Sequence, residues 1–194
     1  LSSFAFIVSY FNRRYTGGKF RNLDKDIKLI WNEANPVKEW VGSIKKEIDT
    51  LTKLKPLEII ETPNRTLDLT LFVLLKSRGV TRDLSGRSLL APVAAKEDKP
   101  EFHHIFPQKC LRGTQFEENT HHIANFTLIT SKTNKEISKK KPSYLLKIKD
   151  DIKKQHFIPT NKKLYRVDRY DKFIEERQKL LANALNRFLT NRSK

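Results

Sequence analysis

The chain has 194 residues, of which 38% are hydrophobic and 31% are charged, and its formal net charge is +17 at pH 7. This composition excludes a disordered chain, and apolar runs such as Leu71–Leu75 are far shorter than the ~20 residues of a membrane-spanning helix. A pI of about 10.0 favours nucleic acid as the partner, because basic proteins gain affinity for polyanions through counterion release. The alternative is a basic surface that serves solubility alone.

The single cysteine, Cys110, excludes an internal disulfide and a multi-cysteine zinc site, and this usage is typical of the reducing cytoplasm. We expect Cys110 to be a small core residue rather than a nucleophile. The segment 1–9 lacks a basic leader and a cleavage site, so no signal peptide is predicted. Because the chain contains no Met and starts at Leu1, we expect it to be a piece of a longer protein.

Residues 1–95 are predicted to form a helical region. One amphipathic helix is indicated by apolar residues at helical spacing, namely Trp40, Val41, Ile44, Ile48 and Leu51. A second helix is predicted to begin at Pro63-Asn64 and to end before Gly79. Its inward face is expected to carry Leu67, Leu71, Leu74 and Leu75. These stripes are typical of core packing and indicate no chemistry.

The character of the sequence changes after a turn at Arg82–Arg87 and a polar linker at 94–100. We therefore predict a domain boundary between 1–95 and 96–194. In the second part, 103–107 and 123–130 are predicted strands. A helix capped by Thr130 or Ser131 should then run to Lys141, where Pro142 stops it. Strand, loop, strand and helix is the order of a ββα unit.

A last amphipathic helix is predicted over 168–189. The residues that share its apolar face are Tyr170, Phe173, Ile174, Leu181, Leu185 and Phe188. The residues expected to lie largely outside that face are Glu175, Glu176, Arg177, Lys179 and Arg187. The predicted fold class is therefore α+β and mostly helical, with a ββα unit between an N-terminal helical region and closing C-terminal helices.

Four of the five histidines lie in two adjacent pairs, His103-His104 and His121-His122. Neutral imidazole binds metals, and its pKa of about 6.5 suits proton transfer, so this clustering favours a metal or catalytic site over a structural role. Adjacent strand residues point to opposite faces, so His103 and His104 can share a site only where the strand ends, near Pro107.

Two asparagines are expected beside this histidine pair. Asn125 is predicted on the second strand, and Asn134 is predicted on the first turn of the following helix. In a ββα unit both converge with His104 at the open end of the hairpin.

The segments Glu101–Pro107, Ile123–Thr130 and Thr133–Ser138 resemble the HNH nuclease domain at the C-terminal end of GmrSD-like restriction proteins. The resemblance is specific over about 101–145 and looser over 155–190. In that family a ParB-like nucleotide-hydrolysing domain commonly precedes the nuclease, which implies such a domain as a partner in the full-length protein.

The resemblance implies a role for each matching residue. His104 stands for the base that deprotonates the attacking water, and Asn125 for the asparagine that braces the hairpin loop and orients the base. His103 replaces a frequent metal-binding aspartate, and Asn134 replaces a frequent histidine. These two residues are the expected ligands of one divalent ion (Mg²⁺, Mn²⁺, Ni²⁺ or Zn²⁺). Three neighbouring residues are reserve candidates with a supporting or structural role: Glu101, His121 and His122.

Nine lysines and three acidic residues lie between 131 and 154. A lysine run is usually a solvated face, but beside a phosphodiesterase motif it could hold the DNA backbone without reading its sequence. The predicted phosphate contacts are Lys132, Lys135, Lys139, Lys140 and Lys141.

These features together predict a metal-dependent endonuclease that cleaves or nicks DNA in defence against foreign or modified DNA. Phosphodiester hydrolysis needs an activated water, a cation and a stabilised leaving oxygen, and one imidazole base with one metal supplies them. Two alternatives remain open, a non-catalytic DNA-binding module and an interaction domain of a larger restriction assembly.

Overall fold

The computed structural model describes residues 66–89, 100–137 and 140–192. The chain divides into two compact units, one of residues 1–59 with 186–194 and one of residues 60–185. Of the described residues, those up to Leu185 belong to the second unit, and the last residues of the C-terminal helix belong to the first. The predicted helix around Trp40–Leu51, the start of the second helix at Pro63-Asn64 and the linker residues 94–99 lie outside the described residues. The predicted boundary near residue 95 stays a prediction.

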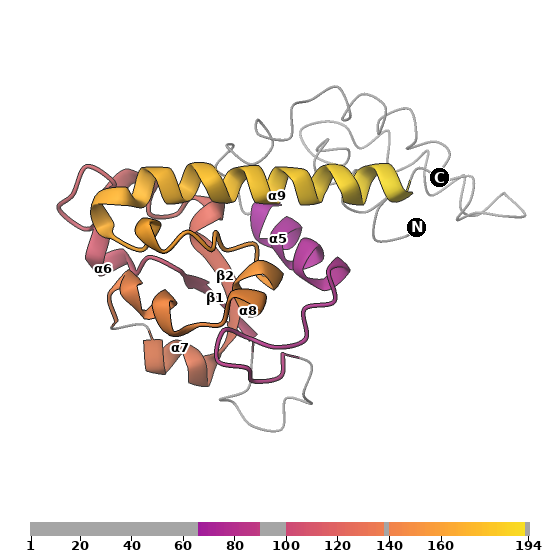
Figure 1. The fold of residues 1–194 in the computed structure, drawn as a ribbon, viewed down its shortest axis with the longest axis horizontal. Coiled ribbons are helices and arrows are strands. Elements are labelled where there is room, and N and C mark those ends of the chain that lie inside the picture. The colour runs from indigo at the N-terminus through magenta and orange to yellow at the C-terminus, as the bar shows by residue number, and fades with distance from the viewer. Residues whose placement is uncertain (1–65, 90–99, 138–139, 193–194) are drawn as a thin grey trace, which may run out of the picture. The chain divides into compact units, whose positions relative to one another are not determined.

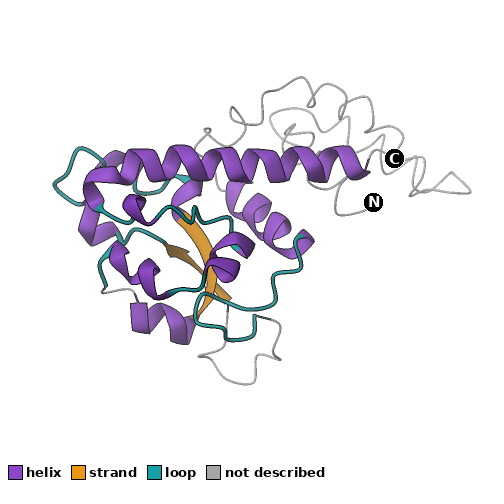
Figure 2. Ribbon diagram, in the orientation of Figure 1, coloured by secondary structure: helices purple, strands orange, loops and turns teal. Residues whose placement is uncertain are grey.

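Helices make up most of the described residues, and the sheet has two strands (Figure 2). The α-helices and strands are α5 (Thr66–Ser77), β1 (Pro100–His104), α6 (Gln108–Leu111), β2 (Phe126–Thr130), α7 (Ser131–Ile137), α8 (Asp150–Gln155) and α9 (Tyr170–Arg192). The 3-10 helices are η2 (Glu117–Asn119), η3 (Ile123–Asn125), η4 (Pro142–Lys147), η5 (Lys162–Leu164) and η6 (Val167–Arg169). A mostly helical α+β class is confirmed.

The strands β1 and β2 form an antiparallel pair whose register runs from Pro100 opposite Thr130 to His104 opposite Phe126. Both strands were predicted, but their bounds were wrong. β1 lies three residues earlier than expected, because Ile105 and Phe106 leave the ladder and bury their side chains completely. β2 starts three residues later, because 123–125 form η3, where the His122 side chain accepts from the Ala124 N–H (3.0 Å).

The helix α7 follows β2 directly and contacts both strands (Figure 1). The Thr130 hydroxyl accepts from the Thr133 N–H (3.3 Å), which confirms the predicted cap. The end predicted at Lys141 is wrong. The described helix ends at Ile137, Lys140 lies in a bend, and Lys141 has an extended backbone that leads into η4 at Pro142.

The helix α9 begins within two residues of its predicted start, and all six residues of its predicted apolar face are buried. Arg177 was expected outside this face and is instead fully buried. It lies on the same stripe as Phe173 and Ile174, four and three residues before it, so its side chain enters the core. Three backbone carbonyls accept from its guanidinium, those of Ala124 (2.7 Å), Phe157 (3.2 Å) and His156 (3.3 Å).

Residues 66–89 pack against the strands and α7. Leu71, Leu74 and Leu75 of α5 are buried as predicted, and Gly79 follows the helix end at a φ of +74°. In the next turn the buried carboxylate of Asp83 accepts from the Thr130 hydroxyl (2.8 Å) and, through its other oxygen, from three groups of its own loop. This turn is therefore tied to the junction of β2 and α7.

Candidate active site

The end of β1 and the first turn of α7 bring His103 and Asn134 into contact. His103 Nδ1 lies 2.9 Å from Asn134 Oδ1. Asn134 Nδ2 donates to Glu101 Oε2 (2.9 Å), and Glu101 also accepts from the Ser131 hydroxyl. Because the amide nitrogen is committed to Glu101, the amide oxygen faces His103, and the proton of this pair sits on His103 Nδ1.

His103 is a buried, neutral imidazole. Its burial lowers its pKa to about 4, so the ring carries no charge at neutral pH. Its Nε2 atom is buried and has no hydrogen-bond partner among the described residues. Its ring packs edge-on against the ring of Tyr144, with a distance of 6.4 Å between the ring centroids. A neutral histidine is the form that binds a metal ion.

His104 lies on the other face of the strand and is partly exposed. Its ring packs on Phe126 with a centroid distance of 4.3 Å, and its Nε2 is 3.3 Å from His121 Nδ1. Burial, with a smaller contribution from His121, lowers the pKa of His104 to about 4. The ring is therefore neutral at pH 7 and has a lone pair with which to accept a proton.

Both histidines and Asn134 line one pocket of about 260 Å³, beside Phe102 and the segment 107–109. His103 and His104 thus both line this pocket at the end of β1, and their roles there stay a prediction. The pocket also adds Gln108 and Lys109, which the sequence interpretation missed. The signal was present, because these residues follow Pro107 directly at the strand end. Lys109 is exposed and lines the same pocket as the two histidines.

Asn125 is placed differently from the prediction. It lies in η3 rather than on β2, it is fully buried, and it does not line the pocket. Its side chain accepts from the Phe106 N–H (2.8 Å) and donates to the carbonyls of Phe106 (3.1 Å) and Thr120 (2.9 Å). Its own carbonyl accepts from the Ile105 N–H (2.7 Å). Asn125 thus holds the two residues that immediately follow His104.

The three reserve candidates occupy distinct positions. Glu101 holds Asn134, and His121 contacts His104, as described above. His122 instead caps η3, and its Nε2 lies 3.1 Å from Gln178 Nε2 on α9. Arg177, which the sequence interpretation placed outside the core, holds the Ala124 carbonyl beside Asn125. Its position on the apolar stripe of α9 was the available signal.

The predicted DNA-contacting lysines that the structure describes are all exposed. Lys132 and Lys135 lie on α7, and Lys140 and Lys141 follow it, while Lys139 lies outside the described residues. A further lysine of the run is not available to DNA, because Lys153 is buried and paired with Asp150 at 2.6 Å.

Across 66–89, 100–137 and 140–192, no group of three or more His, Cys, Asp or Glu side chains could hold a metal ion. No helix in the same ranges is both long and apolar enough to cross a membrane.

The sequence model of the C-terminal domain of GmrSD restriction endonucleases matches residues 74–184, which is more than half of the chain. The chain belongs to this family. No curated protein and no solved structure matches the chain. The GmrSD match begins inside α5, so it includes the Asp83 turn as well as the strands and α7. It also covers every residue of the candidate site and Arg177. Membership associates the chain with restriction endonucleases and their defence function.

Proposed function

We propose that this GmrSD C-terminal domain is a metal-dependent DNA endonuclease of the HNH type, with β1, β2 and α7 as its ββα-metal unit. One observation carries the proposal: His103 Nδ1 and Asn134 Oδ1 lie 2.9 Å apart in the pocket that His104 also lines. A ligand pair and a neutral base are thereby adjacent at the end of one strand.

The residues present fit a divalent ion. Two ligand atoms at ~2.0–2.2 Å from one cation, at the right angles of octahedral coordination, are themselves about 3 Å apart. His103 Nδ1 and Asn134 Oδ1 are 2.9 Å apart, and an ion held by both atoms would replace the Nδ1 proton, with the ring proton then carried on Nε2, which has no hydrogen-bond partner among the described residues. Glu101 holds the amide in the required orientation, as partners of metal ligands commonly do. An imidazole nitrogen with an amide oxygen suits Mn²⁺, Ni²⁺ or Zn²⁺ at least as well as Mg²⁺.

The remaining residues supply the other requirements of phosphodiester hydrolysis. A bound divalent ion would neutralise the charge that develops on the scissile phosphate. His104, neutral at pH 7, takes the proton of the attacking water as general base. Lys109 holds a phosphate oxygen at the pocket edge, and Asn125 keeps the backbone after His104 in place.

DNA is the proposed substrate. The net charge of +17 attracts a polyanion, and the exposed lysines Lys132, Lys135, Lys140 and Lys141 are proposed to contact phosphates around the site together with Lys139. We further propose a cytoplasmic location, a defence role against foreign or modified DNA, and a ParB-like nucleotide-hydrolysing domain as partner in the longer protein.

A plasmid-nicking assay with a panel of divalent ions tests the proposal. We expect His104→Ala to lower the cleavage rate by ~10²–10⁴, the usual cost of losing a general base, while DNA affinity and folding stay nearly unchanged. His122→Asn is the matched control, because Asn keeps a capping oxygen at η3 and His122 does not line the pocket.

Three outcomes would contradict the proposal. Cleavage at the wild-type rate by the His104→Ala protein would show that His104 is not the general base. Salt-sensitive DNA binding without cleavage under any ion indicates a non-catalytic binding module. No DNA affinity at physiological salt indicates an interaction domain.

A further inference from the structure

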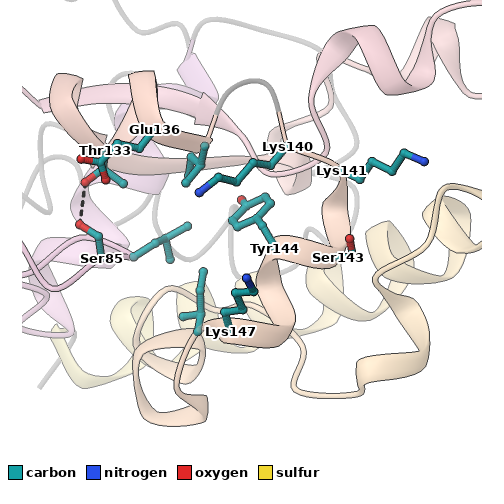
Figure 3. A pocket seen from close by; sticks show the side chains of 11 residues that line it. Ser85, Thr133, Glu136, Lys140, Lys141, Ser143, Tyr144 and Lys147 are labelled. Atoms are coloured by element: carbon teal, nitrogen blue, oxygen red, sulfur yellow. Dashed lines mark hydrogen bonds between the residues drawn. The ribbon is translucent and has the colours of Figure 1, made fainter.

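A second, larger pocket adjoins α7 next to the candidate active site. Its volume is about 490 Å³, within the size range of small-ligand sites. Different residues of α7 line the two pockets, because Asn134 lines the smaller one and Thr133, Glu136 and Ile137 line the larger one. The remaining wall comes from the turn after α5 and from the segment 140–148 (Figure 3).

The walls of this pocket are largely apolar. The apolar residues of its lining are Leu84, Ile137, Ile148 and Tyr144. Tyr144 is 8% exposed, and its hydroxyl has no hydrogen-bond partner among the described residues. An aromatic ring with aliphatic neighbours is a surface on which a planar ring can pack.

The rim of the pocket is cationic. Lys140, Lys141 and Lys147 line it, and all three are exposed. Figure 3 shows the side chains of Lys140 and Lys147 extending towards Tyr144, whereas that of Lys141 points away. The one carboxylate of the lining, Glu136, is held by Arg87 through two bonds of 2.8 and 2.9 Å. The pocket therefore complements a ligand with an anionic group and a planar apolar part.

We propose that this pocket holds one nucleotide of the bound DNA, extruded from the base stack, with its base on the Tyr144 wall and its phosphate at Lys140 and Lys147. The identification of this ligand as a nucleotide rests on the proposed function, because DNA bound at the neighbouring site brings the nucleotide to the pocket. A base that stays stacked in a duplex presents only its edge, so the concave apolar wall is accessible only to an unstacked base.

Binding to short duplexes tests this proposal without cleavage, in chelator and at constant salt. A mismatched nucleotide is already partly unstacked, so its extrusion costs less than that of a paired one. We expect the wild-type chain to bind a duplex with a single mismatch at least about tenfold more tightly than the matched duplex.

Two variants should lose that preference. Lys140→Gln combined with Lys147→Gln removes the cations that face the phosphate, and Ile148→Glu places a carboxylate on the apolar wall. Each should reduce the preference to about twofold or less. Lys154→Gln combined with Lys163→Gln is the control, because it removes two exposed lysines that do not line the pocket and should leave the preference intact.

The outcomes separate this proposal from the proposed function. No mismatch preference in the wild-type chain would overturn it, as would a preference that persists in the lysine pair variant. Circular dichroism checks that each variant is folded, and the lysine pair decides if Ile148→Glu does not fold. Loss of plasmid cleavage with an intact mismatch preference would count against the nuclease proposal alone.

Discussion

Asn125 offers the sharpest test of how the candidate site is held together. Its side chain makes three hydrogen bonds inside the protein, two with the backbone of Phe106 and one with the carbonyl of Thr120. In Asn125→Ala all three backbone groups lose their partner in a fully buried place. At about 1 kcal/mol net for each bond, the free energy of unfolding should fall by about 3 kcal/mol.

Urea unfolding followed by circular dichroism measures this loss, and an unchanged m value shows that the two-state transition is preserved. Asn161→Ala is the matched control, because the Asn161 side chain is exposed and accepts one bond, from the Lys163 N–H. It should cost about 1 kcal/mol or less.

A second substitution at Asn125 separates its donor from its acceptor. Asn125→Asp keeps the acceptor for the Phe106 N–H but turns an oxygen towards two carbonyls, so it should cost at least as much as Asn125→Ala at neutral pH. A loss below about 1 kcal/mol in Asn125→Ala would refute the bracing role. Cleavage at the wild-type rate in a stable Asn125→Ala protein would show that His104 does not depend on it.

Three further predictions concern the metal, the pH dependence and the lysines. EDTA should abolish cleavage, and Mn²⁺ or Ni²⁺ should restore it at least as well as Mg²⁺. His103→Ala and Asn134→Ala should each weaken metal binding and cleavage together. Full activity in chelator would contradict the metal dependence. Burial lowers the pKa of His156 from 6.5 to about 4, so the unfolded chain binds the extra proton first. His156 should therefore contribute up to about 3 kcal/mol to the fall in the free energy of unfolding as pH drops from 6.5 towards 4, in addition to the contributions of His103 and His104. His156→Gln should remove its share of that fall in urea titrations at several pH values. Changing Lys135, Lys139, Lys140 and Lys141 to Gln should flatten the slope of log affinity against log salt by up to ~3–4 units, equally for unrelated DNA sequences. An unchanged slope would show that these lysines are a solvated surface without phosphate contacts.

Local chemistry determined the elements that the sequence could predict. The spacing of Leu71, Leu74 and Leu75 predicted a buried helix face, and the apolar stripe of α9 predicted another, because helical periodicity depends on sequence alone. The pairing of histidines with Pro107 predicted that two adjacent residues of a strand meet at its end, and the pocket contains both.

Tertiary contacts decided the features that the sequence did not predict. β1 ends at His104 because Ile105 and Phe106 bond to Asn125, a residue about twenty positions away that itself lies in a turn rather than on β2. Arg177 is charged and on local grounds belongs on the surface, yet three carbonyls of distant segments accept from it inside the core. Such partners exist only after the chain has folded.

The same division applies to the candidate site. The sequence by itself determined which residue types lie near the strand end, since His103, His104 and Lys109 are neighbours along the chain. Only the tertiary structure placed Asn134 Oδ1 at 2.9 Å from His103 Nδ1 and turned the amide with Glu101, because a side-chain orientation is set by partners from other elements. The larger pocket beside α7 likewise combines residues from 84 to 148, and no local pattern predicts such a wall.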